Sequence, residues 1–436
     1  MKNKYILSGI AAIAALVTTA RAADHVIDIT GATAFRTASI DSIIASYGAG
    51  LTDFAHTGTS AGIASLRGAR QSIFLGTFPG LTGTTLIRCT WTGSVAGVRT
   101  QATPQTSQDF LPESVLTAAV PGAGGTGADA TAIPGKTGAF GAPAGTEFVN
   151  ADLAFSDSFP ANSPFDVSNT VSTIVGITVF VPCVNEGSPA GLTNIHDHQL
   201  RTLYGTGNQP LSYLFPTTDT RRVYMSGRSD NSGTRTIYLS QTGYGPSNLV
   251  QQWKPTSNGA SASAPTLALT TLQLWPTGDG NNVSNVWTAT DTIGNGGFES
   301  SSSLRTVFGA TSNGVQRKNG TGANLGAPVD LLMVGVFGIS DATTAIANGA
   351  KALAYNGSSI VPAEPLAQAS QDKVTSGEYT FWSYQHLMYN SLNDSPELQA
   401  VLAELVANVP TNIGTAGIDQ LLMNVSRVDD FSDVTP

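Results

Sequence analysis

The polar loop within "YMSGRSDNSGTRTIYLSQTGYG", residues 224–245, carries residue types that could bind an oxyanion. In this loop Arg228 precedes the run Ser232, Gly233 and Thr234. A guanidinium offers a planar fork of N–H donors to a tetrahedral anion, hydroxyls add further donors, and a glycine lets the backbone approach a ligand. An ordinary turn followed by a helix N-cap accounts for the same residues equally well. The loop alone leaves both interpretations open.

Asp157 is a lone acid between two serines, and it follows the apolar run "LAF". A carboxylate repels an anion unless the ligand has a proton to donate. Monohydrogen phosphate has such a proton and sulfate does not, so Asp157 would select phosphate by rejecting sulfate. The alternative is that Asp157 only caps a helix.

A recurring strand–loop–helix unit would position these residues. The first unit has a strand over 26–29, and the next two have loops at 93–97 and 156–158. The fourth has a strand over 221–226 and a helix over 233–243. Alternating strands and helices predict βαβ units with a largely parallel sheet, in which ligands lie beyond the carboxyl ends of the strands. Helix N-termini at those ends favour anions.

Several segments resemble the periplasmic phosphate-binding proteins of ABC transporters. "GRSDNSGTRTIY" is similar to that family's Arg-x-Asp-x-Ser-Gly-Thr motif. The segments "ITGATAFRTA", "WTGSVAG" and "LAFSDS" resemble its three earlier ligand loops, in the family's order. Later segments "GLTNIHDHQLRTLYGTG", "GNGGFESSSSLRTVF" and "VTSGEYTFWSYQHLMYN" are also similar to family segments. The resemblance covers most of the chain outside the Gly-rich stretches.

The resemblance implies a set of ligand contacts from four loops. Carried over by position, they are Thr33, the backbone N–H of Phe35, Ser94, Asp157, Arg228, Ser232, the backbone N–H of Gly233, and Thr234. Asp230 would orient Arg228. The sequence departs from the family pattern at Val95, where a glycine is expected, and near Trp382 and His386, where prolines and an arginine are expected. These departures bear on the ligand more than on the fold.

The implied fold is α/β, the two-lobed periplasmic-binding-protein fold of class II type. Each lobe would have a mixed, mostly parallel sheet flanked by helices, and a hinge would join the lobes. The expected boundaries are 23–178 and 340–436 for lobe 1, and 179–339 for lobe 2. The chain would cross near Ile177–Val181 and return near Val334–Ser340.

Two kinds of feature fall outside this pattern. A Gly/Pro-rich stretch at about 101–148 and low-complexity stretches at about 253–297 and 309–327 are predicted to be surface insertions. Cys89 and Cys183 could pair in an oxidising compartment, or act as small buried hydrophobes. We favour the unpaired state.

The first residues have the layout of a secretory signal peptide. Lys2 and Lys4 precede an apolar run from Tyr5 to Val17, and "ARA" ends at Ala22. Cleavage is predicted after Ala22, with a periplasmic or secreted product; an uncleaved amphipathic helix is the alternative. Residues 1–22 carry three basic residues and no acid, so their loss takes the net charge from −9 to −12. This charge argues against nucleic acid as a partner.

Two other motifs suggest chemistry more weakly. "GTSAG" at 58–62 matches the Gly-x-Ser-x-Gly of a hydrolase, but no clear strand leads into it, so we expect a helix start there. "HDH" at 196–198 suggests a metal, but residues two apart do not share a helix face. The sequence therefore predicts no metal, no cofactor and no covalent catalysis.

Together these observations predict a monomeric, exported solute-binding protein that is not an enzyme. It would capture phosphate, or a similar tetrahedral oxyanion, in a cleft between the lobes and present it to an ABC permease. One alternative is a phosphate scavenger or surface adhesion module without a transporter. Another is a hydrolase that uses Ser60 or a serine of the site.

Overall fold

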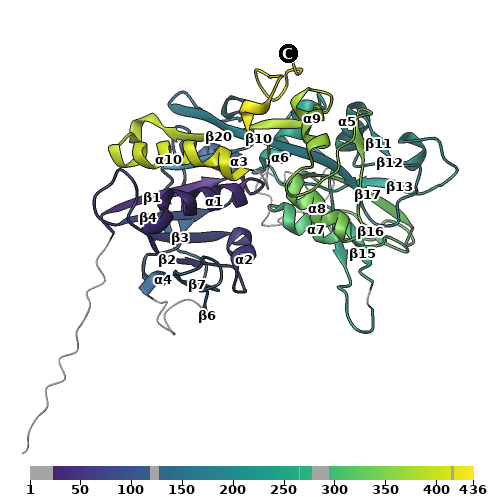
Figure 1. Ribbon diagram of the computed structural model, residues 1–436. Helices are drawn as coiled ribbons and strands as arrows, with labels where there is room; N and C mark the ends of the chain where they lie inside the picture. Colours follow the sequence, from purple (N-terminus) through teal and green to yellow (C-terminus); the bar gives the residue numbers. More distant parts are fainter. Residues whose placement is uncertain (1–22, 118–126, 265, 277–293, 414–416) are drawn as a thin grey trace, which may run out of the picture.

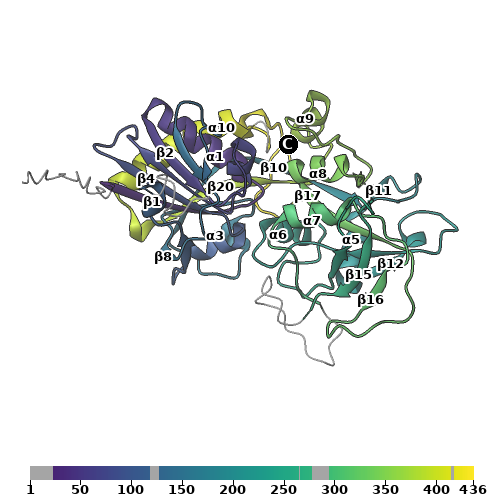
Figure 2. The same cartoon turned by 90° about the horizontal axis from the view of Figure 1, so that it is seen from below.

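The structure is a computed structural model that describes residues 23–117, 127–264, 266–276, 294–413 and 417–436. The predicted signal peptide lies outside the described residues. The chain forms two bodies, each built of strands and helices, that lie side by side (Figures 1 and 2). No helix among the described residues is long and apolar enough to cross a membrane.

The first lobe contains a mixed sheet whose parallel centre is β9–β1–β4, and strands β5 and β8 form a separate pair. Its strands are β1 (His25–Gly31), β2 (Leu51–His56), β3 (Gln71–Gly76), β4 (Thr85–Thr90), β5 (Ser107–Phe110), β6 (Gly127–Ala128), β7 (Thr137–Phe140), β8 (Glu147–Asn150) and β9 (Leu153–Ser156). Its helices are α1 (Arg36–Tyr47), α2 (Ile63–Gly68), α3 (Ser94–Gln101), α4 (Ser114–Thr117) and α10 (Pro396–Asn412). Helices α1 and α10 cover one face and α3 the other (Figure 2). Strands β4 and β9 are buried along their whole length, because both sheet faces are covered.

The second lobe has a shorter parallel centre, β13–β17. Its strands are β11 (Asn194–Ile195), β12 (Asn208–Pro210), β13 (Arg222–Met225), β14 (Trp253–Ser257), β15 (Leu269–Leu274), β16 (Gln316–Lys318), β17 (Leu331–Gly338), β18 (Lys351–Ala352) and β19 (Ala354–Tyr355). Its helices are α5 (Asp197–Thr206), α6 (Gly233–Gln241), α7 (Ser301–Phe308), α8 (Ile339–Ala347) and α9 (Gln368–Thr375). The α/β fold with mixed sheets agrees with the prediction. The parallel pairing that carries the loops is central in each lobe, and many of the flanking pairs are antiparallel.

Two long antiparallel strands join the lobes. Strand β10 (Thr170–Val184) pairs with β20 (Trp382–Asn390) along most of the length of β20. The hydrophobic core of the first lobe includes Val175, and that of the second begins at Ile177. On β20, Trp382 and Tyr384 belong to the second core and Leu387 to the first. We propose that the chain returns to the first lobe on β20, about forty residues later than the expected return near Val334–Ser340.

The Gly-rich stretches, predicted to be surface insertions, contain regular structure. Within 101–148, β7 pairs in parallel with β2, and Leu111 and Val115 belong to a small buried core. The stretches at 253–297 and 309–327 supply β14, β15 and β16, which form a three-stranded sheet. Strand pairing by the backbone does not require an apolar side-chain pattern, so composition hid these strands.

Cys89 and Cys183 are both buried and unpaired, as favoured from the sequence. Cys89 lies in the core of the first lobe and Cys183 in that of the second. Burial raises the pKa of both thiols well above the ordinary range. They therefore act as small core side chains.

Candidate functional site

The carboxyl ends of four strands bring the predicted residues to the interface between the lobes. Thr33 follows β1, Ser94 begins the helix after β4, and Asp157 directly follows β9. Arg228 and Gly233 come from the loop and helix after β13 in the other lobe. We call these five residues the oxyanion cluster. The sheet edge and the helix N-termini meet here, which is where α/β proteins bind anions.

Arg228 is 1% exposed and donates hydrogen bonds to residues of both lobes. Its Nη2 donates to Thr33 Oγ1 of the first lobe at 3.1 Å. On its own lobe, Nε donates to the carbonyl of Phe298 at 3.0 Å, Nη2 to that of Glu299 at 2.5 Å, and Nη1 to the Ser301 hydroxyl. Burial lowers the pKa of Arg228, and nearby carboxylates oppose that shift. These bonds use four of the five guanidinium N–H groups, so the group is held rigidly, and one N–H of Nη1 remains for an anion.

Asp157, in the first lobe, is 1% exposed and interacts electrostatically with Arg228. The Ser94 hydroxyl donates to Asp157 Oδ1, and the backbone N–H of Asp157 donates to Ser94 Oγ at 3.2 Å. Burial raises the pKa of Asp157, and the Ser94 hydrogen bond, the Arg228 charge and the Thr234 hydroxyl oppose the shift. A carboxyl with a raised pKa is suited to share a proton with a bound acid.

Glycines allow the two lobes to touch at the cluster. A Cβ on Gly233 would lie 1.6 Å from Asp157 Oδ1 and 2.6 Å from the Cβ of Ser94. A Cβ on Gly93, whose φ is 109°, would lie 2.3 Å from the carbonyl oxygen of Asn231. That carbonyl accepts the N–H of Val95, the second residue of α3, at 3.1 Å. Only residues without a side chain fit these positions, so the sequence is adapted to lobe contact.

The other predicted residues lie next to the cluster. Ser232 caps α6, because its Oγ accepts the N–H of Arg235 at 3.4 Å, so the N-cap interpretation holds for this serine. Thr234 is buried and faces Asp157. The ring of Phe35 is fully buried against Phe155, with ring centroids 6.1 Å apart, and α1 begins at the following residue.

The role assigned to Asp230 stays a prediction. The groups bonded to the Arg228 side chain belong to Thr33 and to residues 298–301. The charge of Asp230 acts on Arg235, whose pKa burial lowers. Arg235 in turn donates to Asn295 Oδ1 at 2.5 Å and to the carbonyl of Arg228 at 3.4 Å.

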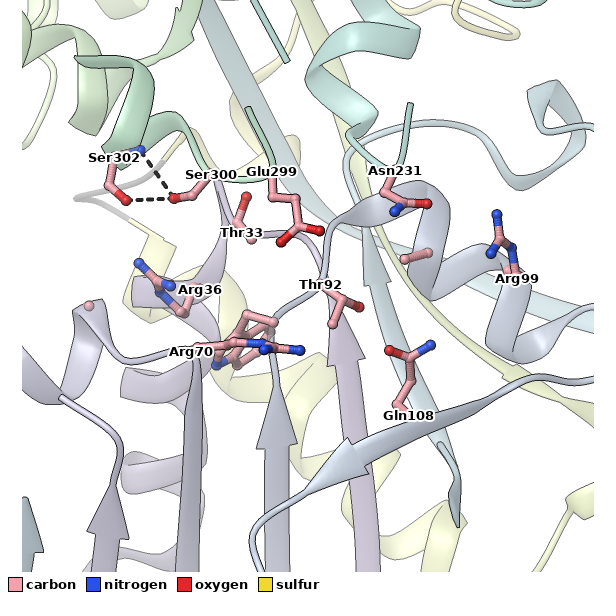
Figure 3. Close-up of a pocket in the computed structure, with 13 residues that line it drawn as sticks. Thr33, Arg36, Arg70, Thr92, Arg99, Gln108, Asn231, Glu299, Ser300 and Ser302 are labelled. Carbon is pink, nitrogen blue, oxygen red and sulfur yellow. Dashed lines mark hydrogen bonds between the residues drawn. The ribbon is translucent and has the colours of Figure 1, made fainter. Parts of the chain in front are cut away.

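Sequence reasoning missed the segment that holds Arg228. Residues 298–301 lie seventy positions further along, and a parallel bridge joins Phe298 to Arg228. The only signal was a Gly-rich start to a helix in "GNGGFESSSSLRTVF". It also missed a cavity of about 380 Å³ beside the cluster (Figure 3). Of the arginines that line this cavity, Arg36 lies in the segment "ITGATAFRTA", and Arg70 and Arg99 lie outside the quoted motifs.

The "GTSAG" stretch does follow a strand, β2, and leads into α2, which corrects the expectation that no strand precedes it. The neighbouring His56 has both ring nitrogens engaged. Its Nδ1 accepts the N–H of Gly58 at 3.1 Å, so its Nε2 carries the proton and donates to Asp129 at 2.9 Å. No ring nitrogen is left to activate Ser60, which is exposed.

The "HDH" residues start helix α5. The side chain of Gln199 accepts the backbone N–H of His196 at 2.9 Å, and the rings of His196 and His198 stack with centroids 5.3 Å apart. Within the part of the chain that the structure describes, no group of three His, Cys, Asp or Glu could hold a metal ion.

No family model matches the chain, and no curated protein matches it. A receptor for ABC-type phosphate transport from Vibrio cholerae is 13% identical, with 90% of this chain and 98% of that chain covered, at a TM-score of 0.41. A phosphate-binding protein from Stenotrophomonas maltophilia is 13% identical, with 90% of this chain and 83% of that chain covered, at a TM-score of 0.32. An OxyR mutant from Corynebacterium glutamicum is 8% identical, with 90% of this chain and 65% of that chain covered, at a TM-score of 0.35.

The similar structures thus include proteins of the kind that the loop motifs resemble.

Proposed function

We propose that this chain is an exported solute-binding protein that captures phosphate, or a similar tetrahedral oxyanion, between its two lobes. The observation that carries the proposal is the meeting of Arg228 with Thr33 and of Gly233 with Asp157 across the lobe interface. These residues come from separate loops and combine a guanidinium, hydroxyls, helix N-termini and one carboxyl with a raised pKa. Such a donor-rich site is suited to a protonated oxyanion.

The closed arrangement suggests how capture would work. Ligand and lobe contacts share the same residues, so an anion that bridges Arg228 and Ser94 favours the state in which the lobes touch. A permease that recognises the closed state would then receive only loaded protein. No covalent step is required, and the engaged ring of His56 disfavours the hydrolase alternative.

Calorimetry of the mature protein with phosphate, arsenate and sulfate tests the proposal. We expect one phosphate or arsenate to bind per chain, and sulfate to bind at least about tenfold more weakly, because only the first two bring a proton to Asp157. Heat from none of the three anions would refute an oxyanion-binding role.

A further inference from the structure

The cavity beside the oxyanion cluster is larger than an inorganic oxyanion requires. Its volume is about 380 Å³, which falls in the range of roughly 300–1,000 Å³ usual for pockets that bind small organic molecules. It borders Thr33 of the cluster and Glu299, whose carbonyl accepts a bond from Arg228. We call it the arginine cavity. Figure 3 shows side chains of both lobes facing it: Arg36, Arg70, Thr92 and Gln108 from the first, and Asn231, Glu299, Ser300 and Ser302 from the second.

The cavity wall is basic in a chain whose net charge is −9. Arg70 donates a hydrogen bond to Asp109 at 3.1 Å, and Arg36 Nε donates one to the carbonyl of Arg67 at 2.7 Å. Arg99 lies over the ring of Phe165 at 5.0 Å, and no ion pair of Arg99 occurs among the described residues. Glu299 is the acid in the wall. Guanidinium N–H groups of Arg36 and Arg99 therefore remain for a ligand.

Two further polar groups of the wall lack a partner. Trp91 is 3% exposed, and its Nε1–H has no hydrogen-bond acceptor among the described residues. The Oδ1 of Asn231 likewise has no donor there. Both atoms are closed to solvent in this arrangement, so a ligand reaches them only after the wall moves; an alcohol hydroxyl would then supply both an acceptor and a donor.

We propose that the arginine cavity holds the polyhydroxylated body of a sugar phosphate, whose phosphate group lies at the oxyanion cluster. The inference rests on the proposed oxyanion site and names a larger substrate class for it. Arg36, Arg70 and Arg99 add donors for ring oxygens and hydroxyls and a positive field for the phosphate. Ser300, Ser302 and Gln108 are hydrogen-bonding side chains of the same wall. In its singly protonated form a phosphate monoester carries a proton that it can donate to Asp157, as monohydrogen phosphate does.

The test is calorimetry of the mature protein with phosphate, glucose 6-phosphate, ribose 5-phosphate, glycerol 3-phosphate and glucose. We expect at least one of the three esters to bind about tenfold or more tightly than phosphate, and glucose alone to give no heat. Arg70→Ala and Arg99→Ala should weaken the ester about tenfold, and weaken phosphate less. Arg201→Ala removes the same charge from an exposed position on α5 and should change neither affinity.

Each failure has a separate meaning. If all three esters bind no tighter than phosphate, or if Arg70→Ala weakens both ligands equally, the cavity is not an ester subsite and the inference is wrong. If neither phosphate nor any ester binds, the oxyanion site itself fails, and both proposals fall. Tight, Arg99-dependent binding of an ester without binding of phosphate would support the ester subsite and restrict the site to esters.

Discussion

Two buried carboxylates of the first lobe behave in opposite ways. Asp129 and Asp157 are each at most 1% exposed. Asp129 accepts from His56 Nε2, the N–H of Gly62, the Thr131 hydroxyl and the N–H of Ala132. Burial alone would raise its pKa, but these donors outweigh burial, and the pKa is lowered. Asp157 accepts from Ser94, and burial dominates, so its pKa is raised.

The difference separates a structural carboxylate from one available to a ligand. All four groups bonded to Asp129 belong to the same lobe. These hydrogen bonds therefore tie a loop to a strand whether the lobes are open or closed. Asp157 has fewer donors and lies against Gly233 of the other lobe. An anion with a proton would complete its hydrogen bonding. The comparison predicts that changes at Asp129 alter stability, and changes at Asp157 and its neighbours alter binding.

The largest effect is expected for Asp129→Ala. Removal of this carboxylate leaves the buried His56 ring and the buried N–H of Ala132 without an acceptor, so the free energy of unfolding should fall by about 3–5 kcal/mol. Chemical denaturation measures the loss. Phosphate affinity of the folded protein should stay near that of the parent, and a loss of affinity without loss of stability would reverse the assignment.

Arg228→Ala should have the largest effect on binding. Loss of one partner of a buried charged hydrogen bond should weaken phosphate by about 2–4 kcal/mol. Arg228→Lys should also weaken it, because the fork geometry is lost. Arg222→Ala, on β13 but outside the cluster, is the matched control for titration calorimetry. Parent-like phosphate affinity in both Arg228 variants would show that the ligand lies elsewhere.

Gly233→Ala tests whether lobe contact is needed. The added Cβ would overlap Asp157 Oδ1, so the lobes could not close fully. We expect phosphate affinity to fall about 10- to 100-fold, or about 1.4–2.8 kcal/mol. In small-angle scattering, saturating phosphate should reduce the radius of gyration of the parent more than that of the variant. Gly205→Ala in α5, where the new Cβ would meet only the Tyr244 ring, is the control.

Asp157→Asn should alter selectivity more than affinity. The amide keeps the volume of the side chain and removes the negative charge. Phosphate should lose one hydrogen bond and one repulsion together, so its affinity should change by about 1 kcal/mol or less. Sulfate affinity should rise, because the repulsion that excludes it has gone. An unchanged ratio of phosphate to sulfate dissociation constants would show that Asp157 does not set selectivity.

The most gradual effect concerns the pH dependence of stability at His56. Burial lowers the pKa of His56, and Asp129 opposes the shift. The unfolded chain takes up a proton near pH 6.5 while the folded chain stays neutral there, so this group contributes stability above about pH 6.5 that is lost as pH falls. His56→Gln keeps a donor and an acceptor without this titration. The stability gap between parent and variant should shrink as pH falls below about 6.5, by at most about 1.4 kcal/mol per pH unit. A gap independent of pH would contradict the assignment.

The sequence predicted the parts of the site that follow from local pattern. Thr33, Ser94 and Asp157 each follow a strand, and that pattern places them at one sheet edge. The hydrogen bonds from Arg228 to residues 298–301 were not predictable. They join segments seventy positions apart mainly through backbone carbonyls, which any residue has. Strand β7 was missed for a similar reason, since its pairing with β2 is made by the backbone.

The central claim is that an oxyanion binds at the contact between Arg228 and the Ser94–Asp157 pair. A crystal structure of the mature protein with arsenate tests it directly, because the anomalous signal of arsenic locates the ligand. The account predicts one site per chain, with arsenate oxygens about 2.7–3.2 Å from the Arg228 guanidinium and the Ser94 hydroxyl. Arsenate bound elsewhere, with Arg228 still bonded to Thr33 and the cluster unchanged, would contradict it.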